Sequence, residues 1–252
     1  MIKVTAVSYL NTKPFLYGLF KSGLSEKTDL QLDIPSVCAQ KLREGEVDLG
    51  LVPVAVLPEL ESPRLLSDFC IGTIGAVKTV CIFSQCPMDA MTHIYLDFHS
   101  KTSVELAKIL LRDYWKVKPE ILPATPGFES KIGGTTGALI IGDRAIGLDK
   151  KYDYVYDLGD VWLKHTGLPF VFAAWVTNTD LDPDFVGQLN EALALGIREI
   201  PQLVCLIPPP HPAFDLKEYY THYISYHFDD AKRRALDRFL SDLGATIPAS
   251  AF

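Results

Sequence analysis

The first 53 residues alternate between short apolar segments and helical segments, and this alternation constrains the fold more than any other feature of the sequence. We expect strands at residues 4–7, 30–34 and 47–52 and helices at residues 14–20 and 37–44. Pro14 suits the first turn of its helix, and Gly45 suits the position just after the end of the second one. Successive β-α-β units favour a parallel sheet, so the sequence predicts an α/β fold.

Polar residues follow the first predicted strand directly. Ser8, Tyr9 and Asn11 stand between this strand and the helix that Pro14 begins. In an open α/β sheet, ligands bind beyond the carboxyl ends of the strands, where the next helix offers unpaired N–H groups. A purely structural turn would use the same residues, with Asn11 or Thr12 as a helix cap and Tyr9 at the edge of the core. The turn by itself is compatible with both interpretations.

A second group of hydroxyl-bearing residues precedes a helix that we expect to begin near Val104. Ser100, Thr102 and Ser103 stand there, and Thr102–Glu105 fits a capping box in which Thr102 accepts the N–H of Glu105 and Glu105 reaches back. Such a helix start can also bind a carboxylate, because its free N–H groups and its dipole favour negative charge. Three hydroxyl groups exceed the need of one cap, so a cap and a ligand site both stay open.

Short polar residues occur at two further strand ends. Ser84 ends the apolar strand expected at residues 80–84, and Gly142 and Asp143 follow the strand expected at residues 138–141. Each has a structural alternative, because Ser84 can start a turn and Asp143 can form a local ion pair with Arg144. Together with the other two groups they would line one cleft if the chain formed two lobes.

The composition argues against several classes of partner. The 252 residues are 48% hydrophobic and carry a net charge of −7 without a basic block, so we expect neither nucleic acid nor an anionic membrane surface as the main partner. No stretch approaches the roughly 20 apolar residues of a membrane span. Residues 1–4 run into the first strand without a targeting leader, so we expect a cytoplasmic protein. The oligomeric state stays open.

Motifs for metal binding and for the common catalytic sets are missing. The five cysteines form no C-x-x-C pair, and the six histidines show no zinc spacing. The sequence contains no G-x-S-x-G elbow, no G-x-x-x-x-G-K loop and no G-x-G-x-x-G fingerprint after a strand. The sequence thus shows no zinc spacing and no phosphate- or dinucleotide-binding motif, and the polar turns offer amides and hydroxyls rather than strong bases.

Two stretches are distinctive, namely Ser-Tyr-Leu-Asn-Thr-Lys-Pro at residues 8–14 and Thr-Gly-Leu-Pro-Phe-Val-Phe-Ala at residues 166–173. With these stretches the chain resembles the chorismate dehydratase family of the futalosine route to menaquinone. The resemblance extends, in order, through residues 38–39, 45–54, 75–77, 102–103, 141–145 and 166–175. The chain departs from the family pattern at Thr79, His99 and Lys101, where serine, serine and arginine are expected, and at Gly137, where an aspartate is common.

The resemblance implies a two-lobed α/β fold like that of the type II periplasmic binding proteins, with a ligand cleft between the lobes. Residues 71–84 and 169–176 are extended and apolar, as expected of segments that pass between lobes. We predict that lobe 1 comprises residues 1–78 and 174–252 and that lobe 2 comprises residues 79–173.

The resemblance also implies a hydro-lyase that removes water from the dianion chorismate to give 3-[(1-carboxyvinyl)oxy]benzoate, with no metal or organic cofactor. We expect one substrate carboxylate at Thr102 and Ser103, and the hydroxyl or second carboxylate near Ser8 and Asn11. The remaining predicted binding residues are Tyr9, Ser84, Ser100, Gly142 and Asp143. Asn11 is the predicted catalytic residue, although its neutral amide can donate a hydrogen bond and cannot act as a strong base. We hypothesise that the enolpyruvyl carboxylate of the substrate takes the proton.

Two other functions fit parts of the same sequence. A non-catalytic cytoplasmic protein that binds a small aromatic or cyclic carboxylate would have the same fold, because fold alone does not determine function. Dihydroxynaphthoate synthase of the same route is the second alternative. Its family turn resembles Ser-Pro-Cys-Pro-Asn-Asp, which the opening turn of this chain lacks.

Overall fold

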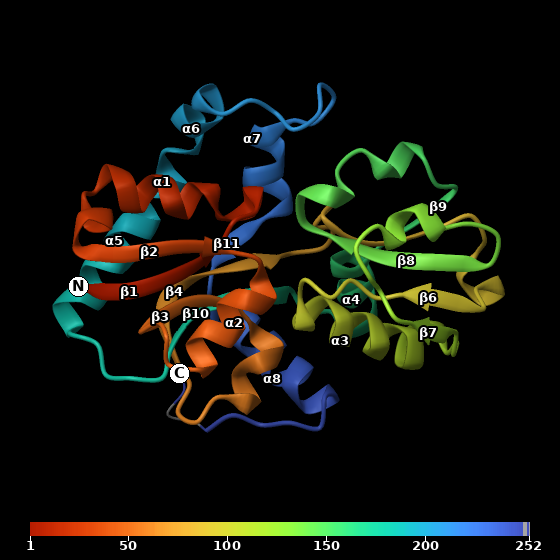
Figure 1. The fold of residues 1–252 in the computed structure, drawn as a ribbon, viewed down its shortest axis with the longest axis horizontal. Coiled ribbons are helices and arrows are strands. Elements are labelled where there is room, and N and C mark those ends of the chain that lie inside the picture. The colour runs from red at the N-terminus through yellow and green to blue at the C-terminus, as the bar shows by residue number, and fades with distance from the viewer. Residues whose placement is uncertain (249–250, 252) are drawn as a thin grey trace.

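Two β-sheets lie side by side in the computed structural model, which describes residues 1–248 and 251 (Figure 1). The first sheet has the strand order β11-β4-β10-β3-β1-β2, and the second has the order β7-β6-β8-β5-β9. The strands of the first sheet are β1 (Ile2–Val7), β2 (Thr28–Asp33), β3 (Leu49–Pro53), β4 (Arg64–Thr73), β10 (Phe170–Thr177) and β11 (Ser225–His227). Those of the second are β5 (Val80–Ser84), β6 (His93–Tyr95), β7 (Glu120–Leu122), β8 (Thr136–Ile141) and β9 (Tyr154–Asp157).

The β-α-β start predicted from the sequence is confirmed. Strand β1 pairs in parallel with both β2 and β3, and the intervening helices are α1 (Lys13–Lys21) and α2 (Pro35–Arg43). Because β1 lies between two parallel neighbours, its carboxyl end opens onto an edge of the sheet where the chain must turn. The sequence places Ser8, Tyr9 and Asn11 in that turn.

Helices cover both faces of the first sheet. In Figure 1, α1 and α5 (Pro183–Arg198) lie on one side of it, and α2 and α8 (Asp230–Asp242) lie on the other. The remaining α-helices in the described part of the chain are α3 (Lys101–Leu110), α4 (Leu158–Thr166), α6 (Ile200–Leu206) and α7 (Leu216–Glu218). Double coverage explains why β10 is buried along its whole length. We call the first sheet with α1, α2 and α5–α8 the first lobe, and the second sheet with α3 and α4 the second lobe.

Strands β4 and β10 bring the chain to the second lobe and back. Strand β4 ends at Thr73 and β5 begins at Val80, while β10 pairs with β4 in antiparallel fashion from Phe170 onward. The predicted boundary at residue 174 thus falls inside β10. Asp157 caps α4 by accepting from the N–H groups of Gly159 and Asp160.

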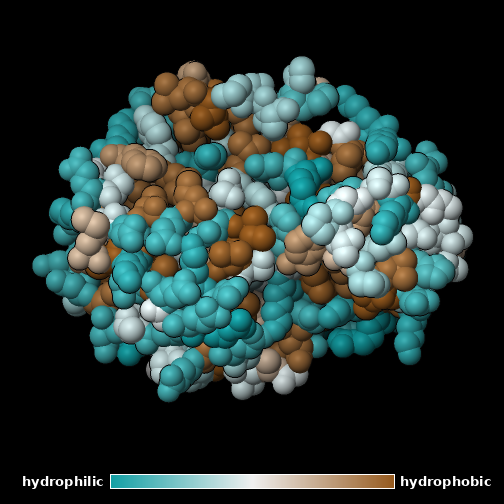
Figure 2. Space-filling model, in the orientation of Figure 1, coloured by the Kyte–Doolittle hydropathy of each residue, from teal (hydrophilic) through white to brown (hydrophobic). Residues whose placement is uncertain are grey.

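The surface is mostly hydrophilic on the face shown in Figure 2, with hydrophobic residues gathered over α6. The Leu206 side chain at the end of this helix is 67% exposed. Among the residues that the structure describes, no helix is both long and apolar enough to cross a membrane.

Candidate active site

A narrow cavity of about 40 Å³ lies between the two lobes. This is smaller than the roughly 300–1,000 Å³ that is typical of small-molecule binding sites, so the cavity is a candidate site because of its position and its polar groups and not because of its size. The first lobe contributes Val7, Tyr9, Asn11, Pro35, Pro53, Ile71, Phe172 and Ala173 to its wall. The segment after β4 and the second lobe contribute Val77, Thr79, Val80, Ser100, Ser103, Ile141 and Gly142. A ligand in this cavity would touch both lobes, so its binding would depend on how they are placed relative to each other.

The opening turn reaches the cavity as the sequence predicts, although not with all its residues. Tyr9 and Asn11 line the cavity, whereas Ser8 is exposed and uses its N–H to bind the carbonyl oxygen of Asp33 at 2.9 Å. The Asn11 carbonyl oxygen accepts from the Tyr226 hydroxyl at 2.9 Å, and its Oδ1 accepts from the Thr12 hydroxyl at 3.2 Å. These contacts fix the main chain and the side-chain oxygen of Asn11.

The start of α3 supplies two further hydroxyl groups, but the predicted cap at Thr102 is wrong. The cap is Ser100, whose Oγ accepts from the N–H of Ser103 at 3.5 Å, and the helix begins at Lys101. Ser100 and Ser103 line the cavity. Thr102 instead accepts from the N–H of Ala55 at 3.0 Å, which joins α3 to the first lobe. Glu105 pairs with Lys108 at 2.8 Å and does not reach back to the helix start.

Gly142 and Asp143 meet the opening turn from the other lobe. Gly142 has a φ of +65°, and a Cβ atom built on it would lie 2.7 Å from Cε2 of the Tyr9 ring. Asp143 accepts from the N–H of Leu10 at 3.0 Å. Burial raises the pKa of the Asp143 carboxyl group, and the hydrogen bond from Leu10 opposes this effect. Asp143 does not pair with Arg144, so it joins the lobes and lies outside the cavity lining.

Ser84 is the one predicted site residue that the structure places far from the cavity. Strand β5 runs antiparallel to β8, with Val80 opposite Ile141 and Phe83 opposite Ala138. The start of β5 therefore faces the cavity, and Ser84 lies at the opposite end. It is buried there, and its Oγ accepts from the N–H of Cys86 at 3.1 Å.

Several residues that the sequence did not reveal as functional lie at or next to the cavity. Thr79 stands in its wall, and its hydroxyl is 2.8 Å from the hydroxyl of Tyr219. His99 Nδ1 is 2.7 Å from the Tyr9 hydroxyl. Thr79 is a polar residue at the start of the strand predicted at residues 80–84, and Ser84 is a polar residue at its end. The sequence pattern favoured the residue at the end, whereas the residue at the start lines the cavity. Nothing local marks His99.

The described part of the cavity wall is mainly apolar, and its polar groups are uncharged. Its lining residues include no carboxylate, imidazole, ammonium or guanidinium group. Burial raises the pKa of the Tyr9 phenol well above its ordinary value, so this hydroxyl is neutral and can donate. A cluster of charges stands next to Tyr9, where Arg144 pairs with Asp97 and, at 2.6 Å, with Glu129. Within residues 1–248 and 251, no group of acidic, histidine and cysteine side chains is arranged to hold a metal ion.

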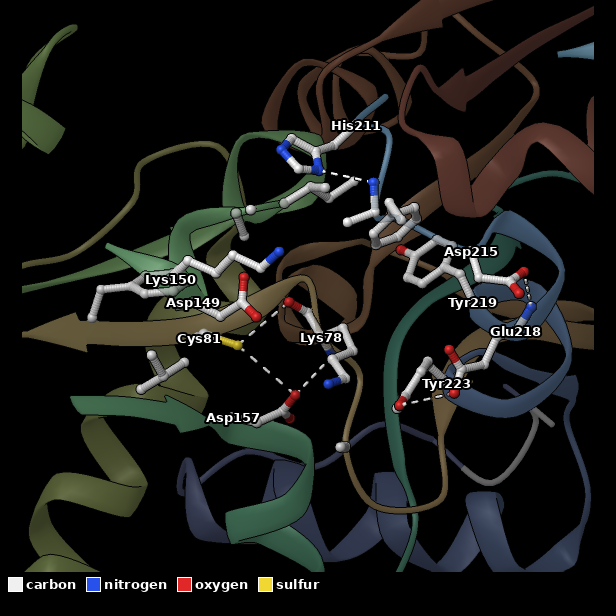
Figure 3. Close-up of a pocket in the computed structure, with 18 residues that line it drawn as sticks. Lys78, Cys81, Asp149, Lys150, Asp157, His211, Asp215, Glu218, Tyr219 and Tyr223 are labelled. Carbon is white, nitrogen blue, oxygen red and sulfur yellow. Dashed lines mark hydrogen bonds between the residues drawn. The ribbon is translucent and has the colours of Figure 1, made fainter. Parts of the chain in front are cut away.

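A larger hollow, of about 440 Å³, lies between the second lobe and the segment that includes α7 (Figure 3). Its lining mixes both signs of charge, with Lys78 and Lys150 among Asp149, Asp157, Asp215 and Glu218. Asp157 is already used there, because it accepts from the N–H groups of Val77 and Lys78 at 3.0 and 2.7 Å. We therefore take the smaller cavity, with its converging neutral hydrogen-bonding groups from both lobes, as the candidate active site.

The sequence matches a family model described as menaquinone biosynthesis over residues 2–244. The chain belongs to this menaquinone biosynthesis family. A curated relative, the chorismate dehydratase of Thermus thermophilus, is 30% identical over 240 residues, which cover 84% of this chain and 85% of the relative. The family resemblance seen in the opening turn thus extends over nearly the whole chain.

Solved structures with low sequence identity share the fold. A protein from Archaeoglobus fulgidus has a TM-score of 0.73 at 13% identity and covers 96% of both chains. The periplasmic aliphatic sulphonate binding protein SsuA of Escherichia coli has a TM-score of 0.57 at 14% identity, with 99% of this chain and 90% of the other covered. The predicted two-lobed, periplasmic-binding-protein-like α/β fold is confirmed.

Proposed function

We propose that this member of the menaquinone biosynthesis family is a chorismate dehydratase, a hydro-lyase that forms 3-[(1-carboxyvinyl)oxy]benzoate and water from chorismate. The observation that carries the proposal is the convergence of Tyr9 and Asn11 with Ser100 and Ser103 on one cavity between the lobes. The activity named for the Thermus thermophilus relative supplies the reaction.

The proposed reaction asks mainly for positioning. One C–H bond of the substrate ring and the C–O bond of the neighbouring hydroxyl break, the released electron pair completes an aromatic ring, and the proton and hydroxide leave as water. No net oxidation or reduction occurs. Holding the dianion in one geometry and excluding water are contributions that two lobes closing around a substrate can make.

The neutral wall suggests how each end of the substrate is held. We place one carboxylate at the start of α3, where Ser100, Ser103 and the helix N–H groups offer donors. Asn11 would donate to the hydroxyl group as it leaves with developing negative charge. Thr102 and Asp143, which the sequence suggested as ligand contacts, would act by joining the lobes.

The proton acceptor belongs to the substrate in this proposal. The described cavity lining offers no carboxylate or imidazole, and the Asn11 amide cannot take a proton at neutral pH. The enolpyruvyl carboxylate of chorismate would lie close to the ring proton and would remove it. A substrate analogue without this carboxylate should bind and fail to turn over; turnover at a rate comparable to that of chorismate would refute the assignment.

The decisive experiment is to incubate the purified protein with chorismate and follow the ultraviolet spectrum. Conversion to the aromatic product supports the enzyme. Thermal stabilisation by chorismate without conversion would instead identify a binding protein, a function that the fold shared with SsuA also permits.

Asn11→Ala tests the proposed catalytic residue. Removing one donor from a developing anion lowers kcat by roughly 100- to 1,000-fold in enzymes that use such donors. We expect a loss of this order in kcat with a smaller change in KM, because the contact strengthens in the transition state. Unchanged turnover would show that Asn11 has no catalytic role.

A further inference from the structure

His99 is the residue through which the second lobe contacts two separate segments of the first. Its Nδ1 is 2.7 Å from the Tyr9 hydroxyl, and its carbonyl oxygen accepts from the N–H of Ser36 at 3.0 Å. The rings of Tyr9 and His99 are nearly parallel, with an interplanar angle of 5° and centroids 6.5 Å apart. Tyr9 precedes α1 and Ser36 lies in the first turn of α2, so both contacts cross from one lobe to the other.

Tyr9 depends on the second lobe for its place in the cavity wall. Its hydroxyl is bound by His99, and its ring fits against Gly142 only because that residue has no Cβ. Both supports belong to the second lobe, while Tyr9 itself belongs to the first. When the lobes separate, Tyr9 loses both supports together.

We propose that His99 is a positioning residue that accepts the hydrogen bond of the Tyr9 hydroxyl when the lobes are closed and thereby keeps Tyr9 in the wall around the substrate. The identity of that substrate as chorismate rests on the function proposed above. His99 does not line the cavity, so it acts on the ligand only through Tyr9.

The surroundings of His99 make this contact sensitive to pH. The groups that face its ring are Tyr9 from the opening turn, Asp97 from its own segment, and Arg144 and Glu129 from the loops around β8. Burial lowers the pKa of the His99 imidazole, and Arg144 lowers it further, against the opposing effects of Asp97 and Glu129. A neutral imidazole can accept from Tyr9 at Nδ1, whereas the protonated ring has no free lone pair there.

The direction of the pH effect follows from this shift. A group whose pKa is lower in the closed form than in the open form binds its proton more tightly in the open form. Closure is therefore fully favoured above the ordinary histidine pKa of about 6.5, and it weakens as the pH falls below that value. The carboxyl groups of chorismate ionise at lower pH and stay charged through this window.

The test compares three single variants and one double variant between pH 5.5 and 8. His99→Ala removes the acceptor, His99→Asn places a non-titrating amide near the position of Nδ1, and Tyr9→Phe removes the donor. We expect His99→Ala to raise KM about 2- to 10-fold at pH 8, as the loss of one hydrogen bond implies, with a smaller change in kcat. His99→Asn should restore a KM close to that of the wild type and should abolish the rise in KM below pH 6.5. The double variant with His99→Ala and Tyr9→Phe should have a KM close to that of His99→Ala alone, because the hydrogen bond is already lost in the single variant.

A second measurement does not depend on the substrate. The His99 ring signal, identified by its absence in His99→Asn, should titrate below 6.5 in the wild-type protein and move upward in Tyr9→Phe. Equal KM values and pH profiles in the wild type and both His99 variants, while the wild type consumes chorismate, would overturn the inference and leave the proposed function intact. A wild type that does not consume chorismate would overturn the proposed function alone. If His99 titrates with the ordinary histidine pKa of about 6.5 in both the wild type and Tyr9→Phe, the inference is overturned whatever the substrate is.

Discussion

Gly142→Ala should have two separate costs, one from backbone strain at residue 142 and one from steric overlap with Tyr9. Gly142 has a φ of +65°, a conformation that costs an L-residue about 1–2 kcal/mol. The new Cβ would also lie 2.7 Å from Cε2 and 2.8 Å from Cζ of Tyr9. The backbone cost applies whether the lobes are open or closed. The steric cost applies only when they are closed, because the two residues belong to different lobes.

The backbone strain should change the melting temperature, and the steric overlap should change KM. The backbone strain should lower the melting temperature by about 2–8 °C, since 1 kcal/mol corresponds to about 2–4 °C in a chain of this size. Overpacking of a close contact costs about 1–3 kcal/mol, which corresponds to a roughly 5- to 150-fold rise in KM for a substrate that binds the closed form. Gly127→Ala is the matched control, because Gly127 has a φ of +86° and a Cβ atom there would meet nothing within 4 Å.

The assay is therefore a pair of measurements on two variants. Differential scanning calorimetry should show a loss of thermal stability in both, and chorismate kinetics should show a raised KM in Gly142→Ala alone. Tyr9→Ala in the Gly142→Ala background should relieve the clash, so that KM rises no further than in Tyr9→Ala itself. If Gly142→Ala and Gly127→Ala have the same KM, then Tyr9 does not form the cavity wall in the way that the structure indicates.

Two further predictions concern stability. Gly187→Ala should raise the free energy of unfolding by about 0.5–1 kcal/mol, because Gly187 lies in a helix interior and a Cβ atom there meets nothing within 4 Å. Gly196→Ala in the same helix should lower the free energy of unfolding by about 3 kcal/mol or more, because its Cβ atom would overlap the Pro14 carbonyl group of α1. Urea unfolding that changes the stability of both variants in the same direction would contradict this contact. Lys232→Met should cost about 1–3 kcal/mol in the same assay, because the buried ammonium group donates to Ser225 Oγ at 2.7 Å and its loss leaves that partner unsatisfied; a stability equal to that of the wild type would show that the ammonium group contributes no net stabilisation.

The sequence predicts the first lobe well because its signals are local. The alternation of strands and helices through Pro53 follows from periodicity and from helix-ending residues, and the structure reproduces it. The position of Tyr9 and Asn11 follows from the same logic, because a parallel strand between two neighbours delivers the next turn to one edge of the sheet. Family membership adds the chemistry that this pattern alone cannot specify.

The prediction that Ser84 lines the cleft is wrong, because it does not take the direction of the strand into account. The rule about carboxyl ends applies to β8, which leads to Gly142, and it reverses for β5, which is antiparallel to β8. The residue before β5, Thr79, consequently takes the place in the cavity that Ser84 was expected to have. A polar residue at either end of a strand looks the same in a sequence, and only the pairing shows which end meets the cleft.

The contacts that organise the site join residues far apart in the chain, and this is why the sequence does not reveal them. Tyr9 meets His99, Thr79 meets Tyr219, and the Asn11 carbonyl group meets Tyr226. In each contact one residue lines the cavity, and its partner lies outside the described lining. The charged groups follow the same arrangement, since the wall itself is neutral and the ionic cluster around Arg144 stands next to Tyr9. A dianion is thereby offered hydrogen-bond donors without a fixed counter-ion, so that its binding depends on closure of the lobes around it rather than on long-range attraction, in agreement with a net charge of −7.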